Sequence, residues 1–166
     1  MVERVEITLA RALKLKNRLA GRLAKLDSDF ETYNSLPAGT DGPNITALYA
    51  ERNELVARLI ELKLALNLAN QPMQRTIFEL GEAKSLVALL SKTSTKHGKV
   101  VESYHGSEVE YVAQFRKRDI DLEVRRLETV IDRLQEELDR FNHRTPIGID
   151  GALLTAIETT PPPAGA

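Results

Sequence analysis

Two histidines and nearby acids are the residues of this chain best suited to metal chemistry. His97 and His105 lie close in sequence to Glu102, Glu108 and Glu110. Imidazole nitrogens and carboxylate oxygens are ligands that suit zinc. Their spacing matches no helical ligand motif, and exposed turn histidines are the simpler interpretation. A metal-dependent hydrolase near His97 and His105 is therefore kept as an alternative function, and we expect no bound metal or other cofactor.

Paired acids do not assemble an obvious catalytic site. Glu136–Glu137 and Asp119–Asp121 fall on the outer faces of the last predicted helix. Acid catalysis needs carboxylates that share a shielded cleft, in environments that separate their pKa values. The sequence also contains no P-loop, dinucleotide-binding glycine motif, His-Glu-x-x-His or Gly-x-Ser-x-Gly. We predict no catalytic residue and no enzymatic activity.

A basic cluster is the candidate site for anions. Arg116, Lys117 and Arg118 precede a second pair of cations, Arg125 and Arg126, and the first predicted helix is also basic. Such side chains can contact phosphates. Aromatic residues, which stack on unpaired bases, are only 5% of the chain. A nucleic-acid-associated accessory protein that uses the basic first helix and Arg116–Arg118 is the other alternative function.

The composition points to long helices. The chain has 166 residues, with 42% apolar and 28% charged residues, no Trp and no Cys. Leu, Ala, Glu, Lys and Arg dominate, as in coiled coils. A net charge of −1 gives no overall field toward nucleic acid or an anionic membrane. Without cysteine, disulfides, thiolate metal sites and cysteine nucleophiles are excluded.

Four helices are predicted from the periodic spacing of apolar residues and from the prolines, glycines and capping residues at the helix ends. The first spans roughly Val2–Leu36 and ends at a segment with two prolines and two glycines. The second begins after Asn44 or Thr46, either of which can cap it. The third runs roughly Pro72–Lys92. The fourth begins near Asp119 and is over before Pro146.

Apolar residues in these helices recur in steps of four and three, the spacing of a coiled-coil seam. Lys16 and Arg52 interrupt the first two seams, whereas the last seam is uninterrupted. Tyr49, Val56 and Ile60 are predicted to widen the second stripe. Extra leucines on the first helix suggest packing between two neighbours. The predicted seam residues are Leu19, Leu23, Leu26, Phe30, Leu55, Leu59, Leu62, Leu66, Ile120, Val124, Leu127, Ile131, Leu134, Leu138 and Phe141.

Between the third and fourth helices the period changes to two. Val109, Tyr111 and Ala113 alternate with acids, and Gly106 lies in a turn-like segment. We predict a β-hairpin near residues 99–114. An isolated hairpin is marginal in water, so it needs a helical surface or another subunit.

The predicted organisation is a helical bundle over residues 1–145 and an extended, flexible tail over residues 146–166. The tail ends in a Pro- and Ala-rich segment. The N-terminus is charged and lacks an apolar signal core. The longest apolar run, Leu86–Leu90, is too short to span a bilayer. We therefore expect a cytoplasmic protein without a membrane partner.

Three segments in order, followed by the last heptad helix, resemble a known family. They are Ala65–Asn70, Arg75–Leu80 and Ser107–Val112, and the resemblance covers roughly Ile7–Asn142. The family comprises small uncharacterised bacterial helical proteins that are often labelled septicolysin. It implies a helical bundle with a β element and no established activity. The cytolysins suggested by that label are larger, β-rich and carry a Trp-rich segment, so their activity does not carry over to this chain.

The predicted fold is mainly α: an antiparallel helical bundle or coiled coil of about four long helices, with a small β-hairpin before the last helix. The leading functional hypothesis is a non-enzymatic structural or interaction protein that self-associates through its heptad-patterned helices. A homo-oligomer is the expected assembly, with a further protein partner as an additional expectation. These expectations follow from the apolar stripes and from the edges of the hairpin, which need cover.

Overall fold

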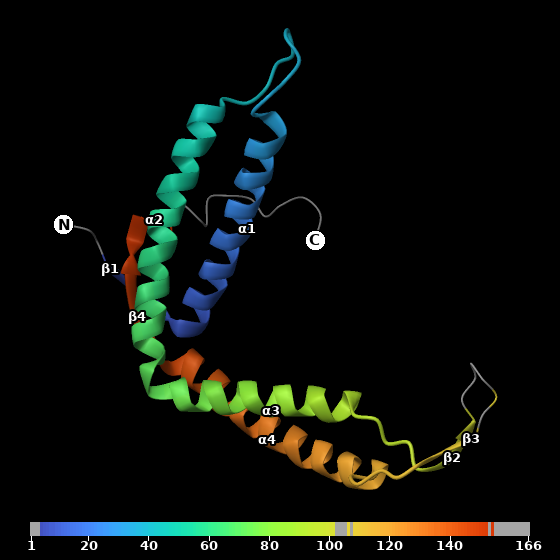
Figure 1. Cartoon of the computed structure of the whole chain (residues 1–166). Coiled ribbons are helices and arrows are strands. Elements are labelled where there is room, and N and C mark those ends of the chain that lie inside the picture. Colours follow the sequence, from blue (N-terminus) through green and yellow to red (C-terminus); the bar gives the residue numbers. More distant parts are fainter. Residues whose placement is uncertain (1–3, 102–105, 107, 153, 155–166) are drawn as a thin grey trace. The chain divides into compact units, whose positions relative to one another are not determined.

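A computed structural model describes residues 4–101, 106, 108–152 and 154 of the chain (Figure 1). They form two compact units. The first unit comprises Met1–Pro72 and Arg140–Ala166, and the second comprises Met73–Asp139. Within the described part of the chain, no helix is long and apolar enough to cross a membrane.

The first unit is built on two long antiparallel helices, α1 (Leu9–Tyr33) and α2 (Ile45–Asn70) (Figure 1). Both begin at a capping side chain that satisfies a free backbone N–H of the first turn. Thr8 Oγ1 accepts from the N–H of Arg11 at 3.3 Å. Asn44 Oδ1 accepts from the N–H of Ala47 at 3.1 Å, so Asn44 is the cap of α2.

The seam between α1 and α2 carries the main hydrophobic core. In α1 the inward position that heptad spacing assigned to Lys16 is taken by Leu15, which is buried, while Lys16 is half-buried. The buried residues Leu9, Ala12 and Leu15 are therefore spaced three residues apart, and the charged side chain of Lys16 lies at the edge of the seam. The buried helical residues of this core are Leu9, Ala12, Leu15, Leu19, Leu23, Leu26, Leu55, Leu59, Leu62 and Leu66.

A two-stranded antiparallel sheet joins the two ends of the described chain. It pairs β1 (Arg4–Thr8) with β4 (Pro146–Asp150). Val5 lies opposite Ile149 and Ile7 opposite Ile147, so the apolar side chains share one face. Ile7, Ile147 and Ile149 are buried in the core of the first unit.

Two sequence predictions need correction at this sheet. The first helix does not start at the N-terminus: residues 4–8 are a strand, and α1 begins at Leu9. Residues 146–150, predicted as the start of a flexible tail, form β4, and Leu154 beyond it is buried. The backbone continues the pairing, because the N–H of Leu9 donates to the carbonyl of Thr145 at 2.9 Å. The rest of that predicted tail, residues 155–166, lies outside the described residues.

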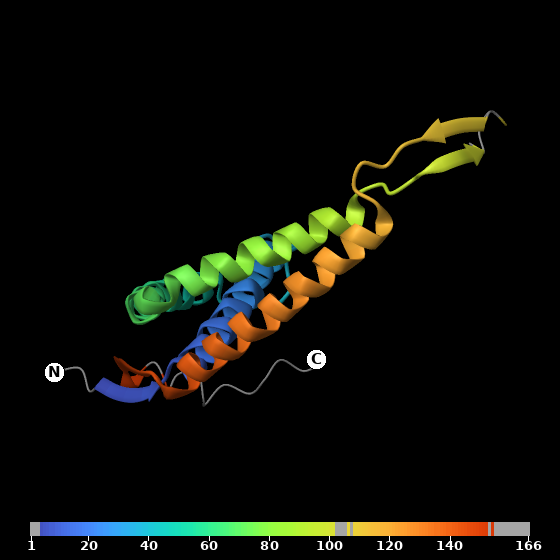
Figure 2. The same cartoon turned by 90° about the horizontal axis from the view of Figure 1, so that it is seen from below.

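The second unit contains α3 (Gln74–Lys92) and most of α4 (Lys117–Arg144), whose last residues belong to the first unit. A 3-10 turn over Gln71–Met73 precedes α3. Figures 1 and 2 show the two helices side by side and antiparallel. Thr76 Oγ1 donates to Glu137 Oε1 at 3.4 Å, which links α3 to α4. The buried residues of this unit are Met73, Leu80, Ala83, Ile120, Leu127, Leu134 and Leu138.

Helix α4 begins two residues before Asp119, near which its start was predicted. Asp119 lies in its first turn, and its Oδ2 accepts from the N–H of Arg116 at 3.2 Å. An acid at this position satisfies a free donor at the helix start and interacts favourably with the helix dipole. Asp119 therefore does stabilise the start of the helix, but from inside its first turn.

The predicted hairpin pairs β2 (Gly98–Val101) with β3 (Glu108–Tyr111), beyond the ends of α3 and α4 (Figure 2). Val100 lies opposite Val109, and Lys99 Nζ lies 3.3 Å from Glu108 Oε2. Residues 102–105 and 107, between the strands, lie outside the described residues. The predicted fold class is confirmed: long antiparallel helices, with a small hairpin before the last one.

Candidate functional surfaces

His97 has a structural contact. Its Nδ1 accepts from the N–H of Ala113 at 3.2 Å, which ties together the chain segments at the open end of the hairpin. Glu108, a proposed co-ligand, pairs with Lys99. His105 and Glu102 lie outside the described residues. Over the ranges that the structure describes, no three His, Asp or Glu side chains gather closely enough to hold a metal ion.

Two cations near the start of α4 form local surface ion pairs. Lys117 pairs with Asp121 on the next turn. Arg126 donates through Nε and Nη2 to the two carboxylate oxygens of Glu123, at 2.8 and 2.6 Å. Arg116 and Arg118 are exposed. Their role as anion contacts stays a prediction.

The cations of α1 also pair locally. Arg22 of α1 donates from Nε to Glu51 Oε1 of α2 at 3.0 Å. Arg52 of α2 pairs with Asp27 of α1. Arg52 is the polar residue that interrupts the predicted seam of the second helix. Both pairs are about one-third to one-half exposed, where an ion pair contributes at most about 1 kcal/mol. They border the apolar seam and fix which edges of the two helices meet.

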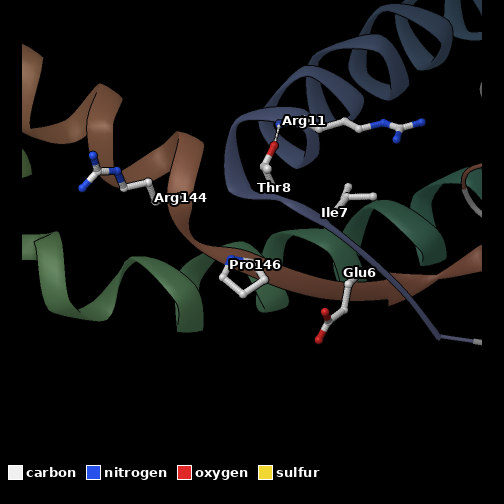
Figure 3. Close-up of a pocket in the computed structure, with 6 residues that line it drawn as sticks. All are labelled: Glu6, Ile7, Thr8, Arg11, Arg144 and Pro146. Carbon is white, nitrogen blue, oxygen red and sulfur yellow. Dashed lines mark hydrogen bonds between the residues drawn. The ribbon is translucent and has the colours of Figure 1, made fainter.

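A hollow of about 400 Å³ lies where β1 leads into α1. It is lined by Glu6, Ile7, Thr8, Arg11, Arg144 and Pro146 (Figure 3). Figure 3 shows the guanidinium groups of Arg11 and Arg144 pointing away from each other, and Glu6 pointing in a third direction. Because these charged groups do not converge on one point, the hollow offers no assembled anion or catalytic site.

An open groove of about 670 Å³ runs between α3 and α4. Its apolar lining includes Ala83, Leu86, Leu127 and Val130. Its charged lining comprises Glu79, Glu82 and Arg126. Glu79 pairs with Arg75, and Arg126 with Glu123, so these groups are already used on their own helices. The groove suits apolar contact rather than chemistry.

An open apolar surface lies on α2, on the side away from α1. Ile60, Leu64 and Leu68 are 51%, 54% and 64% exposed. At 100° per residue they fall almost opposite the buried Leu55, Leu59, Leu62 and Leu66. We call the stripe formed by Asn53, Ala57, Ile60, Leu64 and Asn67, with Leu68 beside it, the outer seam of α2.

The sequence interpretation of α2 is wrong at one position. Ile60 was expected to widen the inward stripe, but it points outward. Tyr49 and Val56 do flank the α1 contact: Val56 packs against the core, and the Tyr49 ring lies 5.8 Å from that of Phe30. Two-sided apolarity was expected on the first helix, but Leu13 and Leu15 of α1 both pack in the core of the first unit, and it is α2 that has a second, exposed apolar face. The signal was visible in the sequence, because residues 53, 57, 60, 64 and 67 repeat the heptad step.

Comparisons with known proteins reveal a shared fold. No protein-family model matches the chain, and no curated protein matches it significantly. One solved structure is similar, described as that of a functionally unknown conserved protein from Corynebacterium diphtheriae. The two chains are 18% identical with a TM-score of 0.65, and the match covers 86% of this chain and 99% of the other. The chain therefore has the fold of a conserved bacterial protein without an assigned function.

Proposed function

We propose that this protein is a non-enzymatic interaction protein that self-associates, with a second copy covering the outer seam of α2. The observation that carries the proposal is the two-sided apolarity of α2: one heptad seam is buried against α1, and a second faces solvent. A helix that is apolar on opposite faces normally packs between two neighbours. In the first unit α1 and β4 both pack against α2, and neither covers Ile60, Leu64 or Leu68.

The energetic reason is the aliphatic surface left in water. Ile60, Leu64 and Leu68 each expose more than half of their surface. Burial of apolar surface contributes about 25 cal/mol per Å². A contiguous exposed patch of this kind commonly marks a contact site. A straight stripe is also self-complementary, since a two-fold axis brings the same patch of both copies together.

The non-enzymatic part of the proposal rests on the arrangement of polar groups. In the described residues, the charged groups of the hollow beside β1 diverge, and Glu79 and Arg126 of the groove pair with neighbours on their own helices. His97 accepts a backbone hydrogen bond. Acid, base or metal catalysis needs such groups to converge on a shielded point. The apolar character of the open surfaces instead favours binding to another protein surface.

The test compares two double variants of the full chain. Ile60→Gln/Leu64→Gln removes the aliphatic surface and retains two good helix-forming side chains. Lys14→Gln/Arg18→Gln is the matched control, since it changes two exposed residues of α1 that lie outside the outer seam. Sedimentation velocity over a series of concentrations measures association, and circular dichroism verifies that each variant is folded.

We expect the wild type and the control to form dimers, and the Ile60→Gln/Leu64→Gln variant to remain a folded monomer. A wild type that stays monomeric at every concentration would overturn the proposal. So would a folded Ile60→Gln/Leu64→Gln variant that associates as strongly as the wild type, because the contact would then lie elsewhere.

A further inference from the structure

From the outer seam we infer that two copies of the chain pair through α2 in a parallel, in-register coiled coil. The inference rests on the proposed self-association and adds its geometry. A two-fold axis parallel to α2 would place each residue of the outer seam opposite its own copy. The contact would be limited to this face, because the opposite face of α2 packs on α1.

The spacing of the outer seam suits a coiled coil. Asn53, Ala57, Ile60, Leu64 and Asn67 follow one another in steps of four, three, four and three. This period keeps a straight stripe toward one partner over roughly 20 Å, at 1.5 Å per residue. The aliphatic residues occupy its middle, and one asparagine stands at each end.

The asparagines choose between parallel and antiparallel pairing. In the parallel, in-register pair, Asn53 meets Asn53 and Asn67 meets Asn67 of the second copy. An amide both donates and accepts, so two facing asparagines can satisfy each other. Consider instead an antiparallel pair in which Ile60 of one copy packs against Leu64 of the other. In that pair Asn67 of one copy faces Ala57 of the other. The Asn67 amide then lies against the Ala57 methyl group and lacks a hydrogen-bond partner there, which lowers the stability of the antiparallel pair.

The charged edges of the outer seam favour the same orientation. One edge is acidic, with Glu54 and Glu61, and the other carries Val56 and Lys63. Antiparallel coiled coils bring like edges together, which would place the acidic edges side by side. Parallel pairing brings the acidic edge of one copy to the Val56–Lys63 edge of the other. It therefore avoids the repulsion between like charges.

The absence of cysteine from the chain makes the geometry directly testable. Asn53→Cys and Asn67→Cys each introduce a single thiol at the same type of heptad position. A disulfide needs Cα atoms within about 4.4–6.8 Å, so it reports close approach. Each full-length variant is oxidised alone and in an equal mixture, and digestion with mass spectrometry identifies the linked peptides. Asn17→Cys, an exposed position on α1 outside the outer seam, is the control.

Parallel pairing predicts that each seam variant forms a disulfide-linked dimer by itself. Crosslinking should be at least about tenfold faster than for Asn17→Cys, because the dimer holds the two thiols together. The mixture should contain no crosslink between positions 53 and 67.

Two other outcomes separate the inference from the proposed function. Dimers in sedimentation with a 53–67 crosslink, or with no crosslink at either position, would overturn parallel pairing and leave self-association intact. A wild type that is monomeric by sedimentation would remove both.

Discussion

Leu62 and Ile60 lie on the same turn of α2 but in opposite environments. Leu62 is 2% exposed, in the seam with α1, whereas Ile60 is 51% exposed. Leu62→Ala should lower the free energy of unfolding by about 2–5 kcal/mol, because it leaves a cavity in a packed core. Ile60→Ala should change it by only about 0.5 kcal/mol at a concentration where the chain is monomeric. Urea unfolding followed by circular dichroism measures both, and equal losses would contradict the assignment of the two faces.

The Glu123–Arg126 pair gives a prediction for pH. The hydrogen bonds from Arg126 lower the pKa of the Glu123 carboxyl; partial desolvation opposes this shift, and the positive charge of Arg126 adds to it. Since the folded pKa lies below the unfolded one, the stabilisation is present above the unfolded pKa. It is lost as the pH falls through the folded pKa. An NMR titration of the Glu123 carboxyl should show the lowered pKa.

The matched variant for this pair is Arg126→Gln, which removes both the charge and the two-point hydrogen bond. The pKa of Glu123 should then rise toward the ordinary value of a glutamate. An unchanged pKa in the variant would mean that Arg126 is not the cause. The pair is exposed, and its effect on total stability should be small.

Several residue-level assignments depend on tertiary contacts, so the sequence could not specify them. His97 was a metal-ligand candidate because of its residue type. Its observed partner, the N–H of Ala113, approaches only when the hairpin closes. Similarly, Arg52 was visible as a polar interruption of a seam, but its partner Asp27 lies on another helix.

At the scale of elements, local periodicity predicted the helices well and missed β1 and β4. Residues 120–141 of α4 follow one heptad frame, and their inward positions are buried or half-buried. In the N-terminal segment, Val5 and Leu9 fit a helical step, and Val5 and Ile7 fit an alternating one. The segment forms a strand rather than a helix because it pairs with Ile147 and Ile149, which lie more than a hundred residues away in the sequence. No local pattern contains that information.

Gly81 in α3 provides an element-scale prediction. A glycine inside a helix marks either a close helix crossing or a weak spot, and the structure favours the weak spot. No heavy atom outside its own helical surroundings lies within 4 Å of the site that a Cβ would occupy. Gly81→Ala should therefore raise the free energy of unfolding by about 0.5–1 kcal/mol, through the lower flexibility of alanine in the unfolded chain. Urea unfolding checks this value, and a destabilised variant would reveal a close neighbour of α3.

At the scale of the whole molecule, the heptads show which helix faces are apolar but not which faces meet. Four seams are compatible with one four-helix bundle or with separate helix pairs. In the structure α1 pairs with α2 in one compact unit, and α3 lies beside α4 in the other. Within the first unit, α1 and β4 pack against α2, and the outer seam of α2 is exposed. This exposed apolar surface, rather than any single residue, favours self-association.

The molar mass of the wild-type chain in solution tests this case most directly. Static light scattering across a concentration series, without variants or labels, measures it. Self-association through α2 predicts a mass that rises from 18.5 kDa toward twice that value as the concentration increases. A constant mass of 18.5 kDa at every concentration would contradict it.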